Sequence, residues 1–238
     1  MCIRDRHITT KIRSLVVVFT ERGQSELSAG ERRYIGEKLK SSFSKIYENV
    51  PAFEQRGEFF PSLGEGGLTS EQKENLVEVR RKDLKAPVKN FKLGLIKRGP
   101  LEDWSRPINQ ELPQANCYIE TTAPDFKKYP SSDDVPHAFV ASTDTGFMED
   151  ISLISYSLNA GLLGLSKPER TRWLSEYMAI DDKAPRIHKL KTLHLQALAE
   201  PSIVPLMASP YAAVVRKPWK MELSELYANN QLWRIKLR

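Results

Sequence analysis

The chain has 238 residues, a length that suits one large domain or two small ones. Hydrophobic residues make up 40% of it and charged residues 28%, a balance that favours a packed core over disorder. The longest uninterrupted apolar run, Leu15–Phe19, is far shorter than the roughly 20 residues of a membrane-spanning helix, which excludes an integral membrane protein. The two cysteines, Cys2 and Cys117, cannot build a disulfide framework, and no Cys or His spacing suits a zinc site.

The net charge of +6 does not identify a partner. Residues 211–238 hold six basic residues against two acidic ones, so most of the excess lies in the C-terminal tail. Proteins that bind nucleic acids concentrate basic residues on one face and interleave aromatic side chains with them. A solvated basic tail is the simpler interpretation, and we expect no nucleic-acid partner.

The first six residues, Met1–Arg6, resemble translated sequencing-adapter read-through rather than protein sequence. They contain neither the apolar core nor the cleavage pattern of a signal peptide. We therefore expect residues 1–6 to be a non-native leader. On this interpretation the chain is the C-terminal fragment of a longer protein, and its native N-terminus lies upstream.

The N-terminal part of the chain predicts a strand followed by a long helix. Ser14–Thr20 is rich in β-branched residues and is predicted to be a buried strand. Residues 23–28 are predicted to be a turn. Ser28 and Glu31 have the spacing of a capping box, which predicts the start of an amphipathic helix that ends before Pro51.

Strands and helices then alternate along the chain. Further strands are predicted at Phe91–Ile96, Asn116–Thr121, Ala138–Ser142, Ile203–Met207 and Tyr211–Arg216. Helices are predicted from Glu149 onward, at Lys167–Met178 and at Pro185–Ala199. The three prolines between residues 100 and 113 allow only a short helix there. This alternation predicts an α/β protein.

No catalytic motif stands out. The four histidines lack metal-binding spacing, and the nucleophile motifs of serine hydrolases are absent. Cys117 has apolar neighbours in a predicted strand, which is typical of a small core residue. Asp144 is more informative, because it ends a predicted strand just before Gly146 and a helix. Open α/β sheets bind their ligands at that position. We expect a binding protein and not an enzyme.

Several features follow one another in a fixed order after residue 138: a strand ending at Asp144, then Tyr156 and Asn159, Trp173 to Tyr177 with Asp181 and Asp182, Arg186, Ile203-Val204-Pro205-Leu206, and residues 229–235. Upstream, Phe59-Phe60-Pro61 precedes a Gly-rich loop. With these features the chain resembles the C-terminal part of a family 5 solute-binding protein. Members of this family are the extracytoplasmic receptors of peptide-type ABC importers.

The resemblance implies a two-lobed α/β fold like that of periplasmic binding proteins, in the class of the oligopeptide-binding proteins. Residues 7–90 would form part of lobe 1 and the lead-in to lobe 2, residues 91–203 the ligand-binding lobe 2, and residues 204–238 the return to lobe 1. In such a fragment, we expect strands such as Ser14–Thr20 to have unpaired edges, which promote aggregation. We therefore expect residues 7–238 to express poorly and residues 91–203 to be the more soluble part.

The resemblance also implies a ligand site. In peptide-binding members an Asp at the position that matches Asp144 anchors the α-amino group of the ligand. Phe147, Tyr156 and Trp104 are further candidates for the wall of the cleft. Many peptide-binding members place a Trp and a basic residue near that Asp, and residues 138–143 contain neither. The ligand class thus stays open between a peptide and another amine-bearing solute.

The function implied by the resemblance is reversible capture of a solute between two lobes and its delivery to the permease subunits of an ABC importer. Location would be periplasmic or extracytoplasmic, with membrane attachment only through the transporter or through a lipid anchor in the missing N-terminus. No cofactor or metal is expected. The alternative is a cytoplasmic transcription regulator of the SgrR type, in which a similar lobe pair senses a small molecule.

Overall fold

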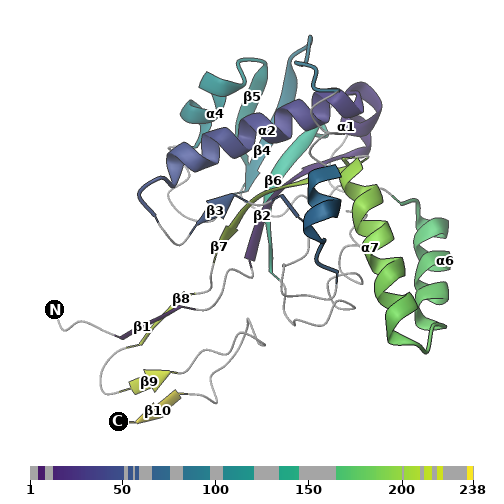
Figure 1. The fold of residues 1–238 in the computed structure, drawn as a ribbon. Coiled ribbons are helices and arrows are strands. Elements are labelled where there is room, and N and C mark those ends of the chain that lie inside the picture. The colour runs from purple at the N-terminus through teal and green to yellow at the C-terminus, as the bar shows by residue number, and fades with distance from the viewer. Residues whose placement is uncertain are drawn as a thin grey trace.

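The computed structural model describes residues 5–8, 13–50, 53–55, 57–58, 66–75, 83–96, 104–120, 134–144, 165–199, 201–209, 212–215, 219–221 and 235–237. Groups of strands alternate with one or two helices along this chain, which closes with four strands (Figure 1). The strands are β1 (Asp5–Ile8), β2 (Arg13–Phe19), β3 (Glu54–Gln55), β4 (Phe91–Ile96), β5 (Ala115–Glu120), β6 (Ala138–Asp144), β7 (Ile203–Ser209), β8 (Ala212–Val215), β9 (Trp219–Met221) and β10 (Ile235–Leu237). The labelled helices are α1 (Glu21–Glu26), α2 (Ala29–Ile46), α4 (Ser105–Glu111), α6 (Lys167–Met178) and α7 (Lys183–Ala199), and residues 70–75 are also helical.

Six strands form one mixed sheet in the order β3-β7-β2-β6-β4-β5. β4 is parallel to β5 and β6, whereas β2 is antiparallel to both β6 and β7. It follows that β4, β5, β6 and β7 run in one direction and β2 runs against them. β2 is thus a central strand with a partner on each side, so the expectation that residues 14–20 would present an unpaired edge is wrong.

The apolar run of β2 fills the core on both faces of the sheet. Val17 and Phe19 belong to a cluster with buried residues of α2 and α4, whereas Val16 and Val18 belong to a cluster with buried residues of α6 and α7. Successive side chains of a strand point to opposite faces, so a continuous apolar run is what a doubly covered strand requires. Figure 1 shows the resulting layers, with helices on each side of the sheet.

Local sequence signals set two helix starts where they were predicted. At the start of α2 the backbone N–H of Ser28 donates to Oε2 of Glu31 at 2.9 Å, and the Ser28 hydroxyl accepts from the N–H of Glu31 at 3.3 Å. α6 begins with the same capping box, in which the N–H of Ser166 donates to Oε2 of Glu169 at 2.7 Å. Both arrangements satisfy N–H groups that have no partner inside the helix.

The predicted turn at residues 23–28 is wrong, because α1 occupies most of this segment. The Thr20 hydroxyl caps the helix by accepting from the N–H of Gly23 at 3.1 Å, and it donates to the carbonyl of Pro136 at 2.6 Å. Gly23 lies directly against the loop before β6, since a Cβ at this position would come within 1.9 Å of the carbonyl oxygen of His137. Contact with a distant loop therefore stabilises α1, and local periodicity gives no sign of it.

Two short antiparallel ribbons lie beyond the sheet. β1 pairs with β8, and β9 pairs with β10. Because β1 precedes β2 and β8 follows β7, two neighbouring strands of the sheet continue outward side by side. Figure 1 shows both ribbons beyond the end of the sheet at which β2 begins and β7 ends. Among the described helices, none combines the length and the apolar character needed to cross a bilayer.

Candidate functional site

The carboxyl ends of four strands meet at one end of the sheet. β4, β5, β6 and β7 run in the same direction and finish at Ile96, Glu120, Asp144 and Ser209. In open α/β sheets, ligands bind outside the carboxyl ends of the strands. The prediction that Asp144 ends a strand is confirmed, and the topology places it at the end of the sheet where a ligand site is expected.

Arg13, which the sequence analysis did not single out, lies next to Asp144 in the ladder. Arg13 begins β2, and its Cα is paired with that of Asp144 on β6 and with that of Ser209 on β7. The register therefore places a basic residue at the ladder position opposite Asp144, although residues 138–143 contain none. No local signal could reveal it, because the two positions belong to strands far apart in the chain.

The other predicted site residues divide into two groups. Phe147 and Tyr156 lie outside the described residues. Trp104 precedes α4 and packs on α2: its ring centroid lies 4.8 Å from that of Phe43 in an edge-on arrangement, and 6.4 Å from that of Tyr47. These contacts place the Trp104 ring against the hydrophobic core. A role in ligand binding for any of the three stays a prediction.

Cys117 has the properties of a structural cysteine. It lies on β5, packs against the core cluster and donates its S–H to Oδ1 of Asn109 over 3.2 Å. Burial raises the pKa of its thiol to about 11. Because the thiolate is the reactive form, this thiol is protonated and unreactive near neutral pH.

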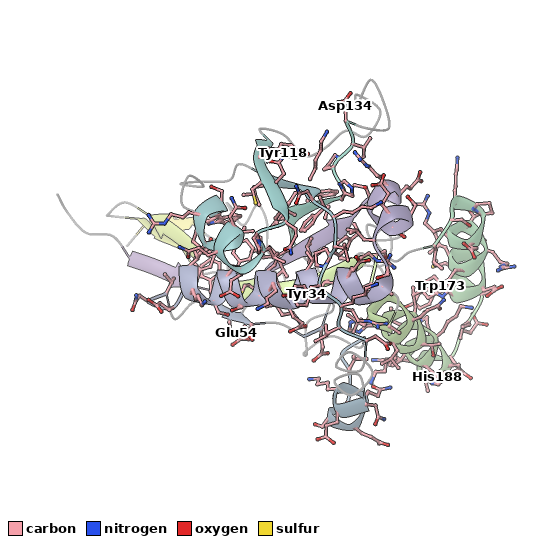
Figure 2. The ribbon with its side chains drawn as sticks, turned by 90° about the horizontal axis from the view of Figure 1, so that it is seen from above. Tyr34, Glu54, Tyr118, Asp134, Trp173 and His188 are labelled. Carbon is pink, nitrogen blue, oxygen red and sulfur yellow. The ribbon has the colours of Figure 1, made fainter. Side chains whose placement is uncertain are left out.

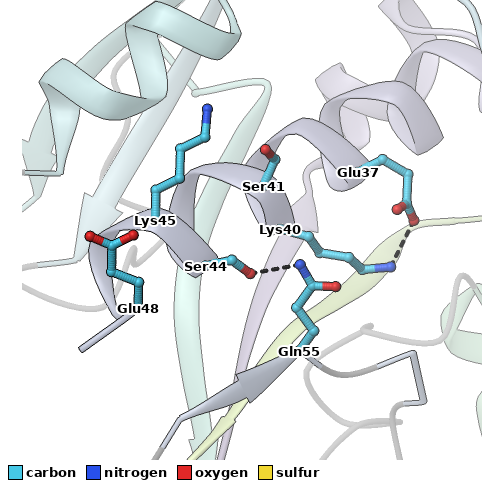
Figure 3. A pocket seen from close by; sticks show the side chains of 7 residues that line it. All are labelled: Glu37, Lys40, Ser41, Ser44, Lys45, Glu48 and Gln55. Carbon is cyan, nitrogen blue, oxygen red and sulfur yellow. Dashed lines mark hydrogen bonds and ion pairs between the residues drawn. The ribbon is translucent and has the colours of Figure 1, made fainter. Parts of the chain in front are cut away.

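A polar pocket of about 530 Å³ lies between α2 and β3 (Figure 3). It is lined by Glu37, Lys40, Ser41, Ser44, Lys45, Glu48 and Gln55. Its lysines are paired with carboxylates: Lys40 Nζ lies 2.7 Å from Oε1 of Glu37, and Lys45 pairs with Glu111. The side-chain amide of Gln55 donates to Ser44 Oγ at 2.6 Å. These pairings compensate the basic groups and point to no ligand class.

No group of three or more His, Cys, Asp and Glu side chains that could hold a metal ion occurs in the part of the chain that the structure describes. Within that part, Asp144 and the strand ends around it remain the candidate site.

The sequence matches no family model and no curated protein. Solved structures do match its fold. The dipeptide binding protein of Pseudoalteromonas sp. SM9913, solved with Met-Leu, superposes with a TM-score of 0.72 at 7% identity over 100% of this chain and 51% of its own. NikA of Brucella suis, solved with Fe(III)-EDTA, has a TM-score of 0.66 at 12% identity, covering 99% and 53%.

OppA of Haemophilus influenzae, solved with the peptide RPPGFSPFR, has a TM-score of 0.62 at 12% identity over 98% of this chain and 50% of its own. At such identities the likeness establishes the fold, and it extends over nearly the whole chain. The chain therefore has the α/β fold of periplasmic solute-binding proteins and spans about half the length of the solved structures that it matches.

Proposed function

We propose that this chain is part of the substrate-binding component of an ABC importer and captures an amine-bearing solute at the carboxyl ends of β4–β7. The observation that carries the proposal is the fold match over the whole chain to a protein solved with a dipeptide. The neighbours named above were solved as binding proteins or with bound ligands. They give no support to the alternative that the chain belongs to a transcription regulator. In this proposal the chain performs no catalysis.

Asp144 is the residue proposed to recognise the ligand. It ends β6 at the ligand-binding end of the sheet, and a carboxylate accepts charge-assisted hydrogen bonds from an ammonium group. Arg13, its partner in the ladder, supplies a guanidinium suited to a carboxylate. A solute that bears both an amine and a carboxylate, such as a short peptide, matches this pair of charges.

The strand order of the sheet suits a different division into lobes from the one that the resemblance implies. β2 lies between β6 and β7, so it belongs to the same hydrogen-bonded layer as β4–β6. We therefore propose that lobe 2 begins at β2 instead of residue 91 and includes β7. The β1–β8 and β9–β10 ribbons, at the ligand end of the sheet, then lead toward lobe 1. Closure about such a connection would trap the solute, and the closed form would deliver it to the permease.

The test is calorimetric titration of the chain with three probes: Met-Leu, its Nα-acetyl derivative, and Ni(L-His)₂, with which the similar NikA of Staphylococcus aureus was solved. Because the proposal assigns the amine to Asp144, Met-Leu is expected to bind and its acetylated form to bind at least about tenfold more weakly. If only Ni(L-His)₂ binds, the ligand is a metal complex and not a peptide. Equal binding of Met-Leu and its acetylated form would contradict recognition of the amine.

A further inference from the structure

His137 joins three elements at the end of the sheet opposite to Asp144. It lies directly before β6 and is only 5% exposed. Its backbone N–H donates to the carbonyl of Lys92 at 3.0 Å, and its carbonyl accepts from the N–H of Thr20 at 3.0 Å. The backbone of one residue thus links the start of β4, the start of β6 and the segment between β2 and α1.

The imidazole ring adds two more bonds, and together they fix its protonation. Nδ1 lies 3.0 Å from the backbone nitrogen of Lys92, and Nε2 lies 3.0 Å from Oε2 of Glu26 on α1. A backbone N–H can only donate, so Nδ1 must accept and carries no proton. The single ring proton is therefore on Nε2, from which it is donated to the Glu26 carboxylate. Only the neutral ring satisfies both partners.

The charges around the ring come from α1 and β4. The other oxygen of Glu26 is paired with Arg22 at 2.8 Å, and Arg22 also donates to the carbonyl of Val135 at 3.2 Å. Burial lowers the pKa of His137; Glu26 opposes this shift, while the positive charges of Arg22 and Lys92 add to it. The net pKa lies below its ordinary value, in agreement with a ring that is held neutral.

We propose that His137 is a pH-sensitive latch, which holds α1 and the starts of β4 and β6 together while its ring is neutral and releases them when the ring takes up a second proton. The second proton would go to Nδ1, where it would face the N–H of Lys92, so two donors would oppose each other. Glu26 would still attract the cation, but the bond to β4 would be lost. The inference does not depend on the proposed function.

The pH range follows from the direction of the shift. A group whose folded pKa lies below its unfolded value stabilises the fold fully above the unfolded value, which is about 6.5 for histidine. This stabilisation is lost as the pH falls from there toward the folded pKa. Opening of the junction is therefore expected to increase below about pH 6.5, by at most about tenfold per pH unit for one proton.

Hydrogen exchange of the whole 238-residue chain at about pH 7.5 and about pH 5.5, corrected for intrinsic rates, tests the latch. The amides of Thr20, Lys92 and His137 are expected to lose protection at the lower pH. The variant His137→Asn should abolish this change, because an Asn side-chain oxygen can accept from Lys92 without titrating. His188→Asn is the matched control, since His188 is an exposed residue of α7 (Figure 2).

The latch is overturned if protection at these amides is independent of pH, or if His137→Asn retains the pH dependence of the unmodified chain. If His137→Asn does not fold, nitrogen NMR of the histidine rings in the unmodified chain decides. A neutral ring protonated on Nε2 near pH 7.5 and an imidazolium at lower pH support the latch. A ring protonated on Nδ1, or charged at about pH 7.5, overturns it.

Discussion

Replacing Val17 by Asp is expected to leave the chain unfolded in the absence of denaturant. Val17 is fully buried in the central strand and is paired across the ladder with Val140 on β6 and Val204 on β7. The substitution loses roughly 1.5–3 kcal/mol of burial and places a carboxylate without a partner in the core, at a cost of several kcal/mol more. The sum approaches the roughly 5–15 kcal/mol that separates a typical folded domain from its unfolded state.

Circular dichroism and urea titration measure this effect. Val88→Asp is the matched control, because Val88 is 80% exposed and its replacement is expected to change the free energy of unfolding by at most about 0.5 kcal/mol. Cooperative unfolding of Val17→Asp at the urea midpoint of the unmodified chain would contradict a central, doubly covered β2. The central position of β2 also argues against the expectation that residues 91–203 are the more soluble part. These residues lack β2, α2 and most of β7.

Asp144→Asn is expected to weaken binding of Met-Leu by about 10- to 150-fold. The substitution keeps the size of the side chain and one oxygen acceptor but removes the charge. A hydrogen bond to a charged group contributes about 1.5–3 kcal/mol, and every 1.4 kcal/mol changes a dissociation constant about tenfold. Isothermal titration calorimetry of the two proteins with the same peptide gives the ratio directly.

Two further variants separate this effect from a general loss of structure. Asp181→Asn replaces an exposed carboxylate between α6 and α7 and is expected to bind Met-Leu as the unmodified chain does. Arg13→Gln is expected to weaken the binding of Met-Leu but not the binding of its C-terminal amide. Only the peptide with a free C-terminus presents a carboxylate to the arginine. An unchanged affinity in Asp144→Asn would assign a structural role to this residue.

Local patterns predicted much of the fold. The β-branched run at residues 14–20 indicated a buried strand, and the structure places β2 there. The predicted helix at Lys167–Met178 has the observed bounds of α6. These features were accessible because capping and strand propensity depend on residues that are neighbours in the chain.

What the sequence did not reveal depends on long-range contacts. α1 is held by the fit of Gly23 against His137, a residue of a distant loop. β2 lies in the middle of the sheet because two later strands pair with it, and that same pairing brings Arg13 opposite Asp144. A local pattern predicts a strand but not its neighbours, so the carboxylate of the candidate site could be predicted and its basic partner could not.

The central claim is that the solute binds at the carboxyl ends of β4–β7, and an amide NMR titration of the chain with Met-Leu tests it most directly. The largest shifts are expected at the strand ends, which are Ile96, Glu120, Asp144 and Ser209. The resonances of amides at the opposite end of the sheet, such as that of Lys92, should not shift. Shifts confined to the opposite end of the sheet would contradict the proposed site.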